Sequence, residues 1–253
     1  MRSLFSKPAA PVLQQQAPAP AVVPEIHGAQ FACVYHGNRI AGDFYDILRV
    51  SSTRIVFGLL DVAGLREDAF EISSKAQEVF RAEATRLLAP DDINEADAMV
   101  ELTLQINRAI MQAASGVHHC PAFSGCYNEA LGTVCYSNAG HVPGLLRDQT
   151  GIAELPATGL PLGLFSHATH DANIVALEPG AALLVVSIGV IEGKCKRDEF
   201  GLERVKKIFL TSPLTDAHSL SVSVLDGVEQ FMCAPPTHDD VTALTLIRKA
   251  QAD

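Results

Sequence analysis

The sequence predicts an α+β protein built on antiparallel β-sheets. Strand-like segments fall into two groups on either side of two long helical segments, instead of alternating with helices as in a doubly wound parallel fold. Short turns join neighbouring strand-like segments, as in hairpins. The chain contains no internal repeat and neither a G-x-G-x-x-G nor a P-loop pattern, so neither of these nucleotide-binding motifs is indicated.

The first strands are predicted between residues 29 and 62. Residues 29–37 alternate in hydrophobicity and are rich in strand formers, which indicates a half-buried strand. Residues 54–62 are almost continuously apolar, which indicates a more deeply buried strand. Between these two segments, residues 42–53 predict a glycine-led turn and a further short strand.

Two long helices are predicted next, at residues 67–88 and 92–114. The first places apolar and small side chains near one face, and Pro90 follows its end. The second opens at Asp91-Asp92, because acidic side chains suit a helix N-terminus. Helices of this length between β segments are expected to cover a sheet.

The second half of the chain returns to β-structure. Residues 122–148 predict two strands joined by a turn near 128–132, then a loop at 138–144, and the glycines that follow indicate irregular chain. Further elements are predicted at 173–189 (strand, turn, strand), 200–210 (helix), 215–232 (helix) and 241–249 (closing strand).

Composition predicts one globular domain. Of the 253 residues, 48% are hydrophobic and 19% charged, so the chain can bury a large core. We place the domain at residues 29–250, preceded at 1–28 by a flexible Pro/Ala/Gln-rich tether. The chain lacks an apolar run of the roughly 20 residues that a membrane span needs, and its N-terminus is a poor signal peptide. We therefore expect no membrane span and a cytoplasmic location.

Charge and cysteine content narrow the function. The net charge of −10 disfavours nucleic-acid binding, because an acidic chain repels phosphate backbones. The six cysteines include no C-x-x-C pair and are too few for a disulfide scaffold, so they are expected to be mostly reduced and buried. None is marked as an activated nucleophile.

Aspartates gather at predicted strand ends and turns. Asp43 and Asp46 lie in a glycine-led turn, Asp61 ends an apolar strand, and Asp239 and Asp240 precede the closing strand. Strand ends can aim carboxylates into a shared cleft, and carboxylate oxygens suit hard cations such as Mg²⁺ or Mn²⁺. Two such ions can activate water for phosphoryl transfer. The alternative is that these aspartates merely favour turns.

The motifs in their order resemble one family. AGDFYD (41–46), LLDVAG (59–64), YSNAGHVP (136–143) and HDDVTALTL (238–246) resemble the metal-dependent type 2C (PPM-type) serine/threonine protein phosphatases, in the SpoIIE-like branch. The resemblance covers residues 29–249. It implies an αββα sandwich, in which two stacked antiparallel β-sheets are flanked by helices.

The resemblance also implies an activity. Such a bacterial enzyme removes phosphate from phosphoserine or phosphothreonine on a small regulatory protein, such as an anti-anti-sigma-like regulator in partner-switching signal transduction. It uses Mn²⁺ or Mg²⁺, and a metal-bound water attacks phosphorus without a cysteine nucleophile. The sequence leaves the oligomeric state open.

The family's metal ligands map onto five positions. Asp61 resembles the aspartate that bridges both metals, and the Val62 carbonyl a further ligand. Asp43 resembles the acid near the first metal, acting partly through water. Asp239 resembles the ligand to the second metal from the last strand, and Asp240 its supporting neighbour.

The histidines are more ambiguous. Asn138, Gly140 and His141 match the family's Asn-Ala-Gly-His loop. His141 is either a general acid, since imidazole titrates near neutral pH, or a structural hydrogen-bonder within a turn. His167 and His170 are expected in a surface loop, because no further cysteine or histidine pair completes a zinc set.

Two positions depart from the family pattern. Ser187-Ile188-Gly189 stands where Thr-Asp-Gly is usual, so Ile188 occupies a lost ligand position, and Glu192 is a weak candidate to replace it. Arg66 brings bulk and positive charge near the site, where a second glycine is usual. Fewer carboxylates weaken the binding of a second ion.

Two hypotheses follow from these departures. The chain is either a working phosphatase with a weakened second metal site, or an inactive pseudophosphatase that binds or sequesters a signalling partner. Four aspartates of the motif remain, which favours the enzyme. Arg66 could favour holding a phosphate, which suits the alternative.

Overall fold

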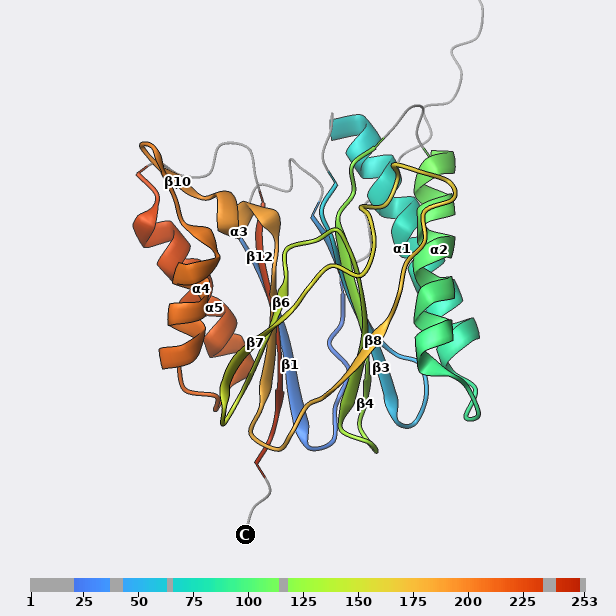
Figure 1. The fold of residues 1–253 in the computed structure, drawn as a ribbon, viewed down its shortest axis with the longest axis horizontal. Helices are drawn as coiled ribbons and strands as arrows, with labels where there is room; N and C mark the ends of the chain where they lie inside the picture. Colours follow the sequence, from blue (N-terminus) through green and yellow to red (C-terminus); the bar gives the residue numbers. More distant parts are fainter. Residues whose placement is uncertain (1–20, 37–42, 63–65, 114–117, 234–239, 251–253) are drawn as a thin grey trace, which may run out of the picture.

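Two five-stranded antiparallel sheets stack face to face between two layers of helices (Figure 1). The computed structural model describes residues 21–36, 43–62, 66–113, 118–233 and 240–250. This arrangement confirms the predicted α+β class and the αββα sandwich. No helix of the described residues is long and apolar enough to cross a membrane.

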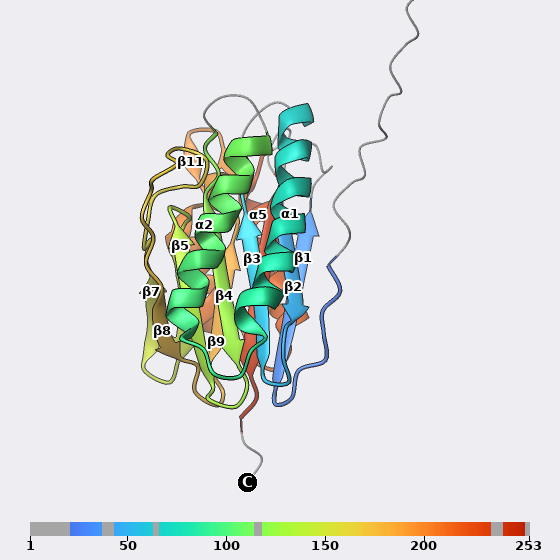
Figure 2. The same cartoon turned by 90° about the vertical axis from the view of Figure 1, so that its right-hand side faces the viewer.

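One sheet is built from the segments before and after the two long helices. Its strand order is β2-β3-β4-β5-β8. The strands are β2 (Phe44–Arg49), β3 (Arg54–Leu60), β4 (Ala122–Asn128), β5 (Thr133–Ala139) and β8 (Asn173–Ala176). Helices α1 (Arg66–Leu88) and α2 (Glu95–Ala113) cover its outer face (Figure 2).

The other sheet brings the two ends of the domain together. Its order is β1-β12-β9-β6-β7. The strands are β1 (Ala29–His36), β6 (Gly144–Asp148), β7 (Gly151–Leu155), β9 (Ala182–Val186) and β12 (Val241–Arg248). Helices α4 (Gly201–Thr211) and α5 (Ala217–Phe231) pack on its outer face.

The apolar run in β3 reflects burial on both of its faces. Val56 and Leu60 belong to the core beneath α1 and α2, whereas Ile55, Phe57 and Leu59 belong to the core between the sheets. Alternate side chains of a strand point to opposite faces, so a strand in this position must be apolar throughout. Each such fully buried side chain contributes about 1.5–3 kcal/mol to stability.

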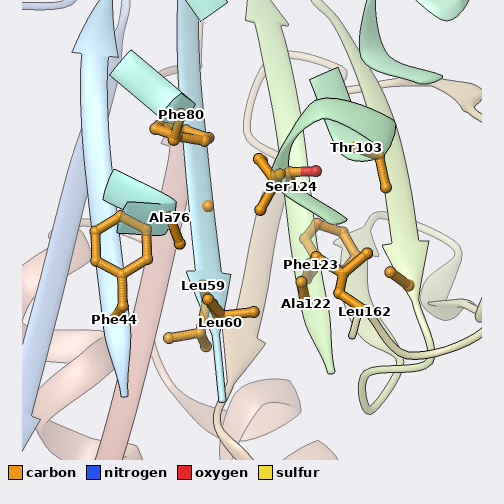
Figure 3. A pocket seen from close by; sticks show the side chains of 13 residues that line it. Phe44, Leu59, Leu60, Ala76, Phe80, Thr103, Ala122, Phe123, Ser124 and Leu162 are labelled. Atoms are coloured by element: carbon orange, nitrogen blue, oxygen red, sulfur yellow. The ribbon is translucent and has the colours of Figure 1, made fainter. Parts of the chain in front are cut away.

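Gly58 lets α1 approach the sheet closely. A Cβ atom there would lie 3.1 Å from the ring of Phe80 on α1. Beside this contact lies a small internal void of about 20 Å³, lined mainly by apolar side chains that include Phe44, Phe80 and Leu162 (Figure 3). The space between helices and sheet is therefore well packed and buries no functional cleft at this point.

Two ion pairs between side chains hold α1 and α2 against the sheet. Arg54 Nε donates to Glu95 at 2.7 Å, and its guanidinium also donates to backbone carbonyls of the turn between the helices. Asp46 is fully buried on β2 and forms an ion pair with Arg81 on α1. Both pairs use charge to hold helices against the sheet.

Part of the predicted N-terminal tether contacts the domain. The backbone amide of His27 donates to Glu129 Oε1 at 2.8 Å, and the carbonyl of Glu25 accepts from Arg49. Arg49 and Glu129 are themselves paired at 2.8 Å. Residues 1–20, the larger part of that tether, lie outside the described residues.

Three local features differ from the sequence prediction. Residues 144–155 form the β6–β7 hairpin instead of a loop and irregular chain, because Gly151 at φ 135° makes its turn. The strand predicted to reach residue 189 ends at Val186, and a short helix, α3 (Ile188–Glu192), follows. A second short hairpin, β10 (Lys194–Cys195) with β11 (Asp198–Glu199), was also unpredicted.

The cysteine prediction needs one correction. Cys195 and Cys233 form a disulfide across 38 positions of sequence, with Cα atoms 4.8 Å apart. No sequence motif marks such a distant pair, which is why the cysteines were expected to be mostly reduced. The other four, Cys33, Cys120, Cys126 and Cys135, are unpaired and buried or half-buried, as predicted.

Candidate metal centre

Strand register brings Asp43 and Asp61 together. In the β2–β3 ladder Phe44 lies opposite Leu60, and the next pair beyond the strand ends is Asp43 opposite Asp61. Side chains directly opposite in an antiparallel pair lie close on the same face. Their carboxyl groups accordingly share a hydrogen bond. The pair lies at the edge of the sandwich where α3 is found (Figure 1).

Asp61 is held on its own sheet by two further contacts. Its backbone amide donates to the carbonyl of Pro121 at 2.9 Å, just before β4. His141 Nε2 lies 3.0 Å from Asp61 Oδ2, and both residues are buried. The carboxylate of Asp61 is therefore fixed in position.

The loop of His141 is itself rigid. The side-chain oxygen of Asn138 accepts from the His141 amide at 2.8 Å, and its nitrogen donates to the Val142 and Leu155 carbonyls. His141 Nδ1 lies 3.1 Å from the carbonyl oxygen of Val142. Both imidazole nitrogens thus face oxygen atoms, so the geometry favours the structural hydrogen-bonding role for His141 over the general acid.

The opposite sheet reaches the same carboxylates. Thr242 Oγ1, at the start of β12, donates to Asp43 Oδ2 at 2.8 Å. The backbone amide of Ile188 donates to Asp61 Oδ2 at 3.3 Å. The Ser187 hydroxyl accepts from the Thr242 amide at 2.9 Å and donates to the Asp240 carbonyl at 3.3 Å, and it also lies beside Asp43. Hydrogen-bond donors on the side of the second sheet therefore hold the two carboxyl groups of the first sheet in place.

The two carboxyl groups titrate differently. Burial, together with the negative charge of Asp61, raises the pKa of Asp43 well above its usual range. Burial opposes ionisation of Asp61 too, but hydrogen bonds from His141, Asp43 and the Ile188 amide lower its pKa overall. The two carboxyl groups therefore differ in their tendency to ionise: Asp43 resists ionisation, whereas Asp61 favours it.

A match to a family model identifies the family to which the chain belongs. A model described as "Stage II sporulation protein E (SpoIIE)" matches residues 51–249 of the chain. The chain belongs to the SpoIIE family. That match includes Asp61, His141, Ile188 and the last strand, and it confirms the resemblance drawn from the sequence motifs.

Individual relatives agree with this membership. Phosphoserine phosphatase RsbP of Bacillus subtilis is 25% identical over 156 residues, which are 61% of this chain and 38% of RsbP. The chain spans about two fifths of the length of the curated relatives it matches. This SpoIIE-family domain is thus related to part of each larger protein.

Solved structures show the same fold. The PP2C phosphatase domain of SpoIIE from Bacillus subtilis, solved with a fragment of its regulatory domain, superposes with a TM-score of 0.73 at 15% identity, covering 89% of this chain and 63% of that one. The RsbU and RsbW domains of a Mycobacterium tuberculosis protein give a TM-score of 0.69 at 24% identity, covering 91% and 64%.

The SpoIIE-family fold implies a divalent cation, and the described donors fit one. Asp43 and Asp61 present adjacent carboxylates, with hydroxyls of Ser187 and Thr242 behind them, so the donor set is all oxygen, as Mg²⁺ and Mn²⁺ prefer. Among the described residues no group of three or more His, Cys, Asp or Glu side chains could hold a metal ion. The described residues thus offer two carboxyl groups to a cation, and Asp239 lies outside them.

The position of Ile188 contrasts with this fit. Its backbone amide, a hydrogen-bond donor, faces Asp61, and its apolar side chain supplies no ligand atom. Glu192 lies exposed at the end of α3, whereas Asp61 is buried, which argues against Glu192 as a replacement. Among the residues that the structure describes, α3 therefore offers no carboxylate ligand to the site.

Several predicted site residues lie apart from this cluster or outside the described part. The carboxylate of Asp46 forms an ion pair with Arg81. Asp240 is buried, and its backbone carbonyl accepts from Ser187 at 3.3 Å. Val62 is buried next to Asp61. Asp239 and the side chain of Arg66 lie outside what the structure describes.

The other histidines are divided in their exposure. His167 is exposed, as a surface loop requires, but His170 is buried against Gly159, contrary to the prediction. Burial lowers the pKa of His170, so the neutral imidazole is favoured there.

Sequence reasoning missed Ser187 and Thr242. Both stand inside the quoted motifs, directly before Ile188 and two residues after Asp240, but serine and threonine carry no metal-ligand signature of their own. Only the stacking of the two sheets shows that their hydroxyls reach Asp43.

Proposed function

We propose that this chain is a metal-dependent phosphoserine/phosphothreonine protein phosphatase that acts on a small regulatory partner. One Mn²⁺ or Mg²⁺ ion is held firmly at Asp43 and Asp61, and a second is held weakly because of Ile188. The observation that supports this most is the contact between the half-buried carboxyl group of Asp43 and the buried carboxyl group of Asp61 at the edge of the sandwich. A cation would neutralise two adjacent carboxylates, whereas a turn with a purely structural role needs no such pair.

Each residue has a defined part in this proposal. Asp61 and Asp43 bind the cation, and the Val62 carbonyl is a further ligand. Asp239 serves the second ion, with Asp240 as its neighbour. When bound, the cation supplies Lewis acidity toward phosphate oxygens and toward the attacking water.

The surrounding residues position this set. His141 orients Asp61, and Asn138 fixes the loop that carries His141. Ser187 and Thr242 hold Asp43 from the opposite sheet. None of these roles requires a thiol, which agrees with the protonated state of the buried cysteines.

The relatives support the substrate class. RsbP is a phosphoserine phosphatase, and one structural neighbour joins an RsbU domain to an RsbW domain. We therefore infer a phosphorylated anti-anti-sigma-like protein as the substrate, with residues 29–250 as the phosphatase domain, residues 1–28 as a tether, and a cytoplasmic location.

Hydrolysis of a phosphoserine peptide, followed by phosphate release while Mn²⁺ is titrated, tests the proposal. The wild-type chain should show Mn²⁺-dependent turnover that Asp61→Asn abolishes. Asp226→Asn is the matched control, because Asp226 is an exposed carboxylate on α5, and it should behave like the wild type. Turnover that persists in Asp61→Asn would refute the proposed site.

The alternative is a pseudophosphatase that binds or sequesters a phosphorylated signalling partner. The amide of Ile188 facing Asp61 favours it, because a donor stands where the family has a ligand. Arg66 would then help to retain phosphate. Absence of turnover in the wild type, together with turnover in Ile188→Asp, would establish this alternative.

A further inference from the structure

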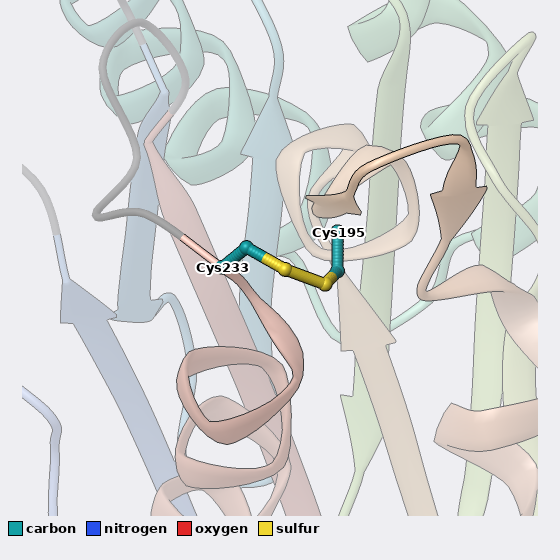
Figure 4. The surroundings of a disulfide bond; sticks show 2 residues. All are labelled: Cys195 and Cys233. Atoms are coloured by element: carbon teal, nitrogen blue, oxygen red, sulfur yellow. A yellow bond between two sulfur atoms is a disulfide. The ribbon is translucent and has the colours of Figure 1, made fainter.

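The disulfide lies at the same edge of the molecule as the carboxylates. Cys195 is in β10, three residues beyond the end of α3, and Cys233 follows the end of α5 (Figure 4). Gly193 allows this approach, because a Cβ atom there would lie 3.1 Å from Val228 and 3.5 Å from Met232 of the α5 end. The hairpin of β10 and β11 thus rests on the end of α5.

Cys233 is the most accessible of the six cysteines. It is exposed, whereas Cys195 and Cys33 are half-buried and Cys120, Cys126 and Cys135 are buried. Burial raises the pKa of Cys120 and Cys135 to about 12, and that of Cys33 and Cys126 higher still. Thiolates are the reactive form, so the buried thiols are inert at neutral pH.

The hairpin places exposed basic side chains around Cys195. Lys194 and Lys196 flank it and Arg197 follows, while Asp198 lies opposite it across the hairpin. Lys196 and Arg197 form the hairpin turn, with Lys196 at φ 60°. Cationic neighbours and partial exposure are the surroundings in which cysteines form thiolates and undergo oxidation.

The crosslink lies near, in the sequence, to the two residues that contact the carboxyl groups from the second sheet, Ile188 and Thr242. On one side, Cys195 follows α3, whose first amide donates to Asp61. On the other, Cys233 precedes the last strand, where Thr242 donates to Asp43. Without the crosslink these two segments are joined through α4 and α5; with it they are joined directly.

We propose that Cys195 and Cys233 are a site of reversible oxidation whose disulfide clamps the edge of the molecule beside Asp43 and Asp61. With a hydroperoxide as oxidant, the Cys195 thiolate attacks the peroxide oxygen, forming a sulfenic acid and releasing one water or alcohol. The Cys233 thiol then attacks the sulfenic sulfur, forming the S–S bond and releasing water. Two electrons pass from the two thiols to the peroxide, and a dithiol reductant reverses the step.

Cysteine alkylation and peptide mass spectrometry on the full chain test the chemistry. After brief hydrogen peroxide treatment, Cys195 and Cys233 should resist iodoacetamide and appear as one crosslinked peptide, and dithiothreitol should restore both thiols. Cys195→Ser should lose the crosslink and Cys33→Ser should keep it. Alkylation of both Cys195 and Cys233 after peroxide treatment, or a crosslink from either of them to any other cysteine, would overturn the proposal.

Hydrogen exchange and thermal unfolding test the clamp. Oxidation should slow amide exchange in residues 187–193 and raise the Tm by roughly 5 °C, while Cys195→Ser should show neither change. A crosslink that leaves exchange at 187–193 unchanged would disprove the clamp. Neither measurement depends on phosphatase activity, so the outcome stands apart from the proposed function.

Discussion

The two sheets meet at one edge and contribute opposite chemistry there. The β2–β3 side supplies carboxyl groups, Asp43 and Asp61, placed opposite each other by strand register. The β9–β12 side supplies hydrogen-bond donors, the hydroxyl of Thr242 and the amide of Ile188, with the Ser187 hydroxyl beside Asp43. The first side can bind a cation, whereas the second side, as far as it is described, positions the anions that do so.

This difference clarifies the effect of Ile188. An aspartate at that position would add a third carboxylate beside two carboxyl groups that are already in contact. Isoleucine leaves only its backbone amide facing Asp61, which stabilises one anion but cannot ligate a metal. At this position the chain therefore supplies a hydrogen-bond donor to Asp61 and no side-chain ligand atom.

The largest effect is expected from removing the shared carboxylate. Substituting a residue that only hydrogen-bonds a metal ligand typically lowers metal affinity 10–100-fold. Asp61→Asn removes a proposed ligand itself, so it should weaken Mn²⁺ binding by more than about 100-fold. Isothermal titration calorimetry measures it, with Asp226→Asn as control. If Asp61→Asn bound Mn²⁺ with wild-type affinity, the β2–β3 side would not be part of the metal site.

Breaking the contact between the sheets should have the next largest effect. Thr242→Val removes the 2.8 Å hydrogen bond to Asp43 and should weaken Mn²⁺ binding by roughly 10-fold or more. Thr242→Ser keeps the hydroxyl and should restore most of the affinity. Equal loss in both variants would show that Thr242 acts through packing and not through its hydroxyl.

A stability change without a metal effect is expected at Asp46. Asp46→Asn breaks the ion pair between the buried Asp46 and the partly exposed Arg81, and should lower the free energy of unfolding by about 1–3 kcal/mol. Mn²⁺ affinity should be unchanged, because Asp46 is bound to α1. Urea unfolding and calorimetry on the same samples compare the two quantities. A loss of affinity beyond about threefold would place Asp46 in the site.

The smallest effect concerns pH in the absence of metal. The raised pKa of Asp43 means that the unfolded chain ionises this group above about pH 4, while the fold resists ionisation. Stability is therefore lost as pH rises from that value toward the folded pKa. In EDTA, Asp43→Asn should gain stability relative to the wild type between pH 5 and 7, measured by urea unfolding. A wild-type advantage that grows with pH would contradict the assignment.

Most elements of the fold are readable from the sequence. The continuous apolar run at 54–60, the long helices and the alternating last strand each follow from burial pattern. The β6–β7 hairpin was missed because its glycines look like loop punctuation. The end of β9 at Val186 was missed because Ser187 to Gly193 continue an apolar run that suits either a strand or a helix.

The candidate site was predictable only in part. Asp43 and Asp61 were found because acids at strand ends have a chemical meaning. The hydroxyls of Ser187 and Thr242 and the bond between Cys195 and Cys233 were not, because each depends on contacts between segments far apart in the sequence. Such contacts are set by how the two sheets stack and how α5 ends, which hydrophobic periodicity does not specify.

The stoichiometry of Mn²⁺ binding tests the contrast between the two sides most directly. Metal-free wild type and Ile188→Asp are titrated side by side by calorimetry, with Ile188→Val as a size-matched control. The wild type and Ile188→Val should bind one ion tightly, and Ile188→Asp should bind two. Two tightly bound ions in the wild type, or one in Ile188→Asp, would contradict the account.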